Sequence, residues 1–150
     1  MTAGIQEQEA LTAVLLGRWE QASRKVVELA EVIPADEFDS RPLAGIRSLS
    51  EVLRHVAFWN QYAADSLKGR QADEAANELP PAAYSTKASI LEALKRTSAD
   101  AAMALREHPG AIDLKATELI MTFIEHTSEH YAQLVVYTRL MGIVPPASRT

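Results

Sequence analysis

Apolar residues recur every three or four positions in four separate stretches of the chain, the spacing that buries one face of an α-helix. The stretches cover residues 11–33, 49–67, 90–105 and 119–140. The positions expected to face a core are Leu11, Val14, Leu15, Trp19, Ala22, Val26, Leu29 and Ile33 in the first stretch; Leu49, Val52, Leu53, Val56, Trp59, Ala63 and Leu67 in the second; Ile90, Leu94, Ala101 and Leu105 in the third; Leu119, Ile120, Phe123, Leu134, Tyr137 and Leu140 in the fourth. The pattern therefore predicts four helices.

Capping residues and helix breakers set the expected limits of the first three helices. Pro34 follows the first helix. Ser48 and Glu51 match the capping box, in which each side chain accepts a hydrogen bond from a backbone N–H of the other residue. The second helix should therefore start near Leu49 and end at Gly69. Thr86 is the expected cap of the third helix.

The fourth helix has the best-marked end in the chain. It should begin between Asp113 and Thr117, after Pro109 and Gly110 have closed the third helix. Gly142 supplies a residue that can adopt the left-handed conformation, and the two prolines at 145 and 146 prevent continuation.

The segments between these helices lack regular patterning. Residues 35–47 and 70–84 are connectors of more than a dozen residues, rich in polar residues and proline. Sustained apolar–polar alternation and hairpin turn signals are absent. We therefore predict an all-α fold, a single four-helix-bundle domain over residues 1–150 with long crossover connections.

Composition narrows the classes of function. The chain has 20 acidic residues against 15 Lys and Arg and a net charge of −5, whereas duplex binding needs clustered basic residues. No apolar stretch approaches the about 20 residues that span a membrane, and the N-terminus lacks a signal-peptide pattern. We therefore expect a cytoplasmic protein that binds neither nucleic acid nor membrane. The chain has no cysteine, so a metal would need histidine, carboxylate or water ligands.

Three of the four histidines fall on faces expected to point inward. His126 and His130 are four positions apart, which places both imidazoles on one face of the fourth helix. His55 lies in the apolar stripe of the second helix. Burying three unpartnered imidazoles would cost about 1 to 3 kcal/mol each, and one shared divalent ion would satisfy all three. Three separately hydrogen-bonded core histidines remain the alternative. His108, near a helix end, receives no functional role.

A site of three histidines would leave coordination positions open for water or substrate. Neutral imidazoles suit zinc, nickel, copper or ferrous iron. Neighbouring residues could complete the site: Glu51 could hold the second ring nitrogen of His55, although its position favours a role as helix cap alone. Hydroxyls of Tyr62 and Tyr137 could donate into a pocket, and the further polar side chains near these faces are Gln133 and Asn60.

Two segments resemble the DinB-like superfamily, also called DinB/YfiT-like metalloenzymes. They are RPLAGIRSLSEVLRHVAFWN, with a histidine after a capped helix start, and HTSEHYAQLVVYTRLMGIVPPAS, with the paired histidines before a tyrosine-rich helix and a Gly-Ile-Val-Pro-Pro end. On this resemblance His55, His126 and His130 match the family's three metal-ligand positions. The resemblance implies a four-helix bundle with long crossovers, often a homodimer.

The resemblance also implies a chemistry. Members with an assigned activity are metal-dependent transferases and isomerases that use a low-molecular-weight thiol such as bacillithiol or mycothiol. We therefore expect a divalent metal (zinc, nickel or iron), a small-molecule substrate and transfer of a thiol to a small electrophile. The alternative is a stress-related protein that binds a metal or ligand without catalysis. Hydrolysis by a metal-activated water ranks lower, because no general base is evident.

Overall fold

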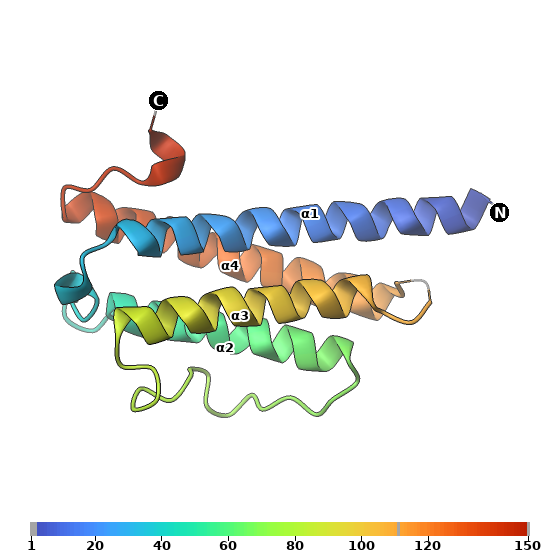
Figure 1. The fold of residues 1–150 in the computed structure, drawn as a ribbon, viewed down its shortest axis with the longest axis horizontal. Helices are drawn as coiled ribbons and strands as arrows, with labels where there is room; N and C mark the ends of the chain where they lie inside the picture. The colour runs from blue at the N-terminus through green and yellow to red at the C-terminus, as the bar shows by residue number, and fades with distance from the viewer. Residues whose placement is uncertain (1–2, 111, 150) are drawn as a thin grey trace.

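The computed structural model describes residues 3–110 and 112–149, so the two ends of the predicted 1–150 domain and residue 111 lie outside the described residues. The helices are α1 (Ala3–Val32), α2 (Leu49–Leu67), α3 (Lys87–Arg106) and α4 (Leu114–Leu140), with short 3₁₀-helices at Ala35–Glu37 and Pro146–Ser148. The described residues contain no β-strand. The predicted all-α four-helix bundle is confirmed (Figure 1). None of the described helices is both long and apolar enough to cross a membrane.

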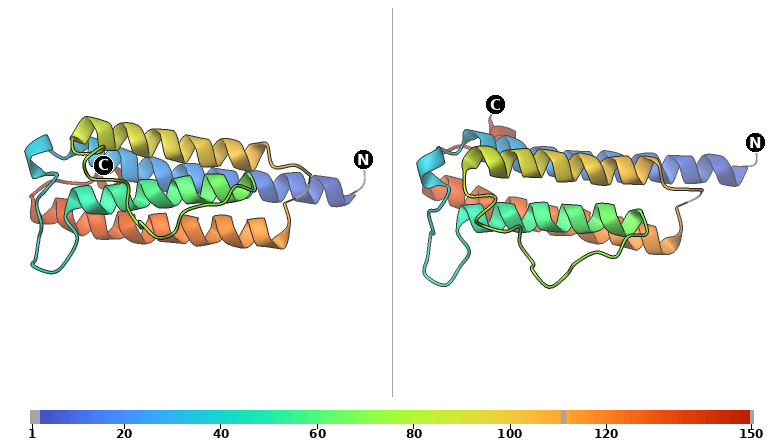
Figure 2. Two further views of the ribbon diagram at one scale, coloured as in Figure 1. Left: turned by 90° about the horizontal axis from the view of Figure 1, so that it is seen from below. Right: turned by 60° about the horizontal axis from the view of Figure 1, so that its bottom comes forward.

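Each helix of the bundle packs against two others. Both α1 and α2 pack against α3 and α4, so α1 and α2 occupy opposite corners of the bundle. Figures 1 and 2 show that α1 and α4 run in one direction and that α2 and α3 run in the other. The segment 68–86 therefore has to return along the bundle to join the end of α2 to the start of α3. It lies against α2 on the way, where the Leu79 N–H donates to the Arg54 carbonyl at 3.4 Å.

The helix limits follow the predicted caps closely. Ser48 and Glu51 form the capping box that starts α2 at Leu49. Thr86 caps α3, where it forms a second capping box with Ser89. These caps matter for the site because α2 carries His55, and a fixed first turn fixes the register of the helix.

The end of α4 is closed by a pair of backbone hydrogen bonds around Gly142. This glycine has φ +75°. Its N–H donates to the Arg139 carbonyl at 3.0 Å, and the Ile143 N–H donates to the Thr138 carbonyl at 2.9 Å. This is the Schellman arrangement that the Gly-Ile-Val-Pro-Pro sequence predicts.

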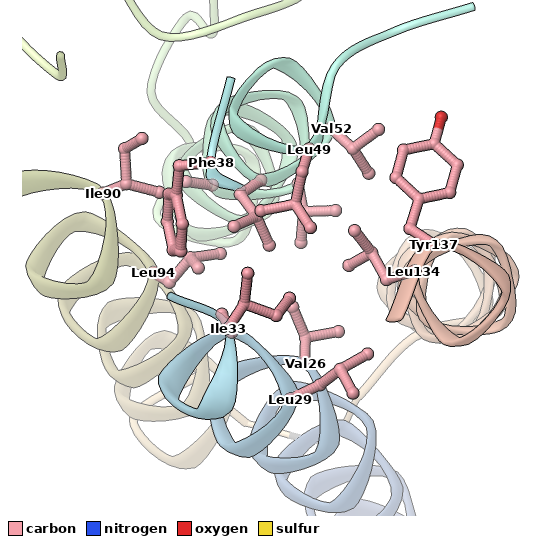
Figure 3. Close-up of a cluster of buried hydrophobic side chains, with 14 of the residues drawn as sticks. Val26, Leu29, Ile33, Phe38, Leu49, Val52, Ile90, Leu94, Leu134 and Tyr137 are labelled. Carbon is pink, nitrogen blue, oxygen red and sulfur yellow. The ribbon is translucent and has the colours of Figure 1, made fainter. Parts of the chain in front are cut away.

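The core divides into two clusters of buried side chains along the bundle. One contains Leu29, Val52, Leu94 and Leu134, together with Tyr137. Figure 3 shows this cluster between the four helices, with the Tyr137 hydroxyl turned away from it. The other cluster is built around Trp19, Leu105, Ile120 and Phe123, with Trp59 packed against it. The positions predicted for the core therefore make both clusters, with the exceptions that follow.

Three predicted core positions are exposed, and for these the prediction was wrong. Leu11 is 39% exposed, Val14 59% and Leu140 70%. Val14 is exposed because it lies on the outer side of α1, as its neighbour Leu15 is only 5% exposed. The helix begins at Ala3 and extends past the ends of the other helices (Figure 1). Leu140 occupies the last turn of α4. Helical spacing alone does not show where neighbouring helices stop.

Candidate metal centre

Three imidazoles meet between α2 and α4. His55 comes from the first half of α2, and His126 and His130 come from successive turns of α4. One ring nitrogen from each lies within 4.8 Å of the other two. The Nε2 atoms of His55 and His126 are 2.9 Å apart. The structure therefore brings together the three histidines that the sequence singles out.

A backbone carbonyl holds the other nitrogen of His55. The Nδ1 of this imidazole lies 2.7 Å from the carbonyl oxygen of Asn77, in the segment 68–86. A carbonyl only accepts hydrogen bonds, so Nδ1 must carry the proton and Nε2 must present a lone pair to the cluster. The Asn77 side chain is held in turn by Trp59, whose Nε1–H donates to Oδ1 at 2.9 Å. Asn77 has φ +56°, a conformation that Asn tolerates better than most residues.

Glu51 does not hold His55, so that sequence-based hypothesis is wrong. Its carboxylate accepts a hydrogen bond from the Ser48 N–H and pairs with Arg41 at 2.9 Å. The Arg41 guanidinium and the Ser48 N–H lower the pKa of Glu51. The Glu51 carboxylate therefore acts as a helix cap and ion-pair partner. The backbone carbonyl of Asn77 instead accepts the hydrogen bond from His55 Nδ1.

A chain of hydrogen bonds fixes the orientation of His130. The Tyr137 hydroxyl donates to the Arg47 carbonyl at 2.8 Å, so it must accept the 2.9 Å hydrogen bond from Gln133 Nε2. That places Gln133 Oε1 against His130 Nδ1 at 2.9 Å. An amide oxygen only accepts, so Nδ1 carries the proton and the Nε2 of His130 is left with a lone pair.

His126 sits among aromatic rings on the other side of the cluster. Its ring centroid lies 6.2 Å from that of Trp59 and 6.0 Å from that of Phe123. Burial, together with the positive charges of His130, His55 and Arg47, lowers the pKa of His126 to about 3. Burial also lowers the pKa of His55. Both imidazoles are therefore neutral at physiological pH, the state in which histidine binds metals.

The remaining residues predicted near the site point elsewhere. The Tyr62 hydroxyl donates to Glu74 at 2.8 Å, beside an open groove that His108 and Asp113 also line. Asn60 is buried on α2, and none of its described hydrogen bonds reaches the histidines. His108 lies at the far end of α3 and takes no part in the cluster.

Sequence reasoning missed two residues that shape the site and understated a third. Asn77 acts through its carbonyl, which every residue possesses, so its type gives no signal. Arg47, which precedes the Ser48 cap, becomes part of the site only when the bundle forms. Gln133 could have been found, because it lies three positions after His130 on the same helix face.

The three residues fit a divalent ion. Two nitrogens bound to one tetrahedral zinc ion at about 2.0 to 2.1 Å lie about 3.3 Å apart, so the His55 and His126 Nε2 atoms, 2.9 Å apart, need to separate only slightly to bind one ion. Two imidazoles have their second nitrogen hydrogen-bonded by a neutral acceptor, as metal-bound histidines generally do. Among the described residues, no carboxylate joins this group.

Comparison with protein families gives an independent result. The family model of the DinB superfamily matches residues 18–134, more than half of the chain. The chain belongs to the DinB superfamily. The matched part of this DinB-superfamily protein contains all three histidines, together with Asn77 and Gln133. A search of curated proteins finds no match. Family membership and the histidine cluster both fit metal binding.

Proposed function

We propose that this DinB-superfamily protein holds one divalent ion through His55, His126 and His130 and transfers a low-molecular-weight thiol to a small electrophile. One observation carries the metal site: three ring nitrogens converge within 4.8 Å from two helices. The thiol chemistry rests on the family resemblance and on the absence of cysteine from the chain, which requires any thiol to come from a cosubstrate.

In this function the protein keeps the imidazoles oriented and neutral, so that they can bind the ion. The Asn77 carbonyl and the Gln133 amide keep the Nδ1 protons of His55 and His130 on the outer side of the cluster. Burial keeps His55 and His126 neutral. A divalent ion bound there supplies a Lewis acid that lowers the pKa of a thiol. Three protein ligands leave positions free for that thiol.

The distribution of carboxylates favours a thiol over water as the nucleophile. In many metal-dependent hydrolases a carboxylate beside the metal-bound water acts as general base. Glu51 is engaged by Arg41 and Ser48, and Glu78 is engaged by Arg54. Neither carboxylate joins the histidines within the described part of the chain. A thiol bound to the ion loses its proton without such a base, because the ion lowers the pKa of the thiol.

A coupled assay of metal content and thiol consumption tests the proposal. Protein prepared without a polyhistidine tag is loaded with zinc, nickel or ferrous iron and mixed with bacillithiol, mycothiol or glutathione and 1-chloro-2,4-dinitrobenzene. In the reaction, sulfur forms a bond to the ring carbon, chloride leaves, and the thiol proton passes to solvent. We expect metal-dependent consumption of at least one thiol, lost in His126→Ala and retained in the control His108→Ala.

The outcomes separate this function from its alternative. A chain that binds metal but consumes no thiol with any electrophile of a broad panel is a metal-binding protein without transferase activity. Thiol consumption that is equal in wild type and His126→Ala would remove the histidines from the reaction.

A further inference from the structure

Two positive charges share one negative charge among residues that adjoin the site's residues in the sequence: Arg54 precedes His55, and Glu78 follows Asn77. Arg47 and Arg54 both pair with the single carboxylate of Glu78. Arg54 Nε lies 2.7 Å from Oε1 and its side chain is 8% exposed. Arg47 NH1 lies 3.4 Å from Oε2 and its side chain is 34% exposed. Within the described residues these are the ion pairs that the two arginines form, so Arg54 is satisfied and Arg47 is held only loosely.

The backbone neighbours of this ion pair are the groups that orient the histidines. The carbonyl of Arg47 accepts the Tyr137 hydroxyl at the end of the chain of hydrogen bonds from His130. Glu78 directly follows Asn77, whose carbonyl holds His55. The half-exposed guanidinium is therefore part of the surroundings of the histidine cluster.

This inference rests on the proposed function. We propose that Arg47 binds a carboxylate group of the substrate and that the reacting group of the same substrate faces the metal. Guanidinium matches a carboxylate with two parallel hydrogen bonds, which a single 3.4 Å contact to Glu78 does not use. Two arginines and one glutamate leave one positive charge, which a singly charged carboxylate neutralises. When the substrate replaces Glu78 on Arg47, Arg54 keeps Glu78, so no buried charge loses its partner.

The test compares two thiols that differ only in this group. The probes are 3-mercaptopropionate and 3-mercapto-1-propanol, added to cobalt-loaded protein. Absorption by the cobalt–thiolate pair reports binding without any need for activity. We expect wild type to prefer the acid by about tenfold, the effect of one charge-assisted hydrogen-bonded pair.

Variants of the arginine assign that preference. In Arg47→Gln the two thiols should bind with equal affinity. Arg47→Lys keeps the charge but not the planar fork, so part of the preference should return. Arg24→Gln is the matched control, because it removes one positive charge from the exposed surface of α1. It should bind both thiols as wild type does.

Each outcome decides between the two proposals. A preference for the acid that survives in Arg47→Gln overturns the role of Arg47 and leaves the thiol function intact. Equal affinity of wild type for both thiols also overturns the role of Arg47 and leaves the thiol function intact. If neither thiol gives a cobalt–thiolate band in wild type, the proposed thiol function itself fails.

Discussion

At the scale of single residues, the chemistry of the site depends on neutral partners. The second nitrogens of His55 and His130 are held by a carbonyl and an amide, where many metal sites use carboxylates. With three neutral ligands and no carboxylate in the described group, a bound divalent ion would keep its full double charge. Such an ion favours an anionic ligand, as a thiolate is.

Gln133 offers a direct test of imidazole positioning. Gln133→Leu removes the acceptor of the His130 Nδ1 proton while keeping the bulk of the side chain. We expect zinc affinity to fall by about 10- to 100-fold, the usual effect of losing such a partner. Competition with a chromophoric chelator measures it. Gln61→Leu is the control, since Gln61 bonds to Asp65 and Arg96 on the surface.

The same hydrogen-bond chain predicts an intermediate variant. Tyr137→Phe leaves Gln133 in place but frees its amide to turn, so its zinc affinity should lie between those of wild type and Gln133→Leu. Wild-type affinity in Gln133→Leu would show that the amide does not position His130.

At the scale of elements, the segment 68–86 behaves as a strap along α2. Three consecutive residues of the segment contact α2. Asn77 forms hydrogen bonds with His55 and Trp59, Glu78 forms an ion pair with Arg54, and the Leu79 N–H donates to the backbone of α2. The segment thereby covers one side of His55 and orients its ring. Its order comes from these contacts, because it contains no helix or strand among its described residues.

Substitutions at Asn77 separate its two roles. Asn77→Gly keeps the backbone conformation at φ +56° and loses only the hydrogen bond from Trp59. Asn77→Ala loses the same hydrogen bond and also places a residue that tolerates the left-handed region less well than Asn at φ +56°, at an added cost of about 1 to 2 kcal/mol. Urea unfolding of the metal-free protein should rank wild type above Gly and Gly above Ala. Equal stability of Ala and wild type would show that the strap does not depend on this residue.

The sequence predicts the helices better than it predicts the strap. Helix limits depend on local signals such as the Ser48 capping box and Gly142, and these are readable within a few residues. The strap depends on contacts between residues about 20 positions apart. The error at Glu51 has the same origin: its spacing from His55 permits a contact, but Arg41, ten positions earlier, takes the carboxylate.

At the scale of the whole molecule, the order of helices decides whether a site exists. The sequence places His55 on one helix and the paired histidines on another, but it does not show that these helices are neighbours. The bundle places α2 next to α4 and puts α1 at the opposite corner from α2. The extension of α1 past the ends of the other helices is a property of the same arrangement, and helical spacing does not reveal it either.

The histidines lie between the two core clusters along the bundle. Val52 and Leu134 belong to one cluster. Phe123 belongs to the other, and Trp59 packs against it. His55 and His126 fall between these positions in the sequence of their helices. Loss of one imidazole therefore leaves both clusters complete, and a histidine variant should stay folded enough to be tested for metal binding.

The most direct test of the metal site is elemental analysis of untagged protein after equilibration with zinc and removal of unbound metal. The account predicts about one zinc ion per folded chain for wild type and His108→Ala, and almost none for His126→Ala. Circular dichroism confirms that each variant keeps its helices. Zinc content in His126→Ala equal to that of wild type would contradict the site.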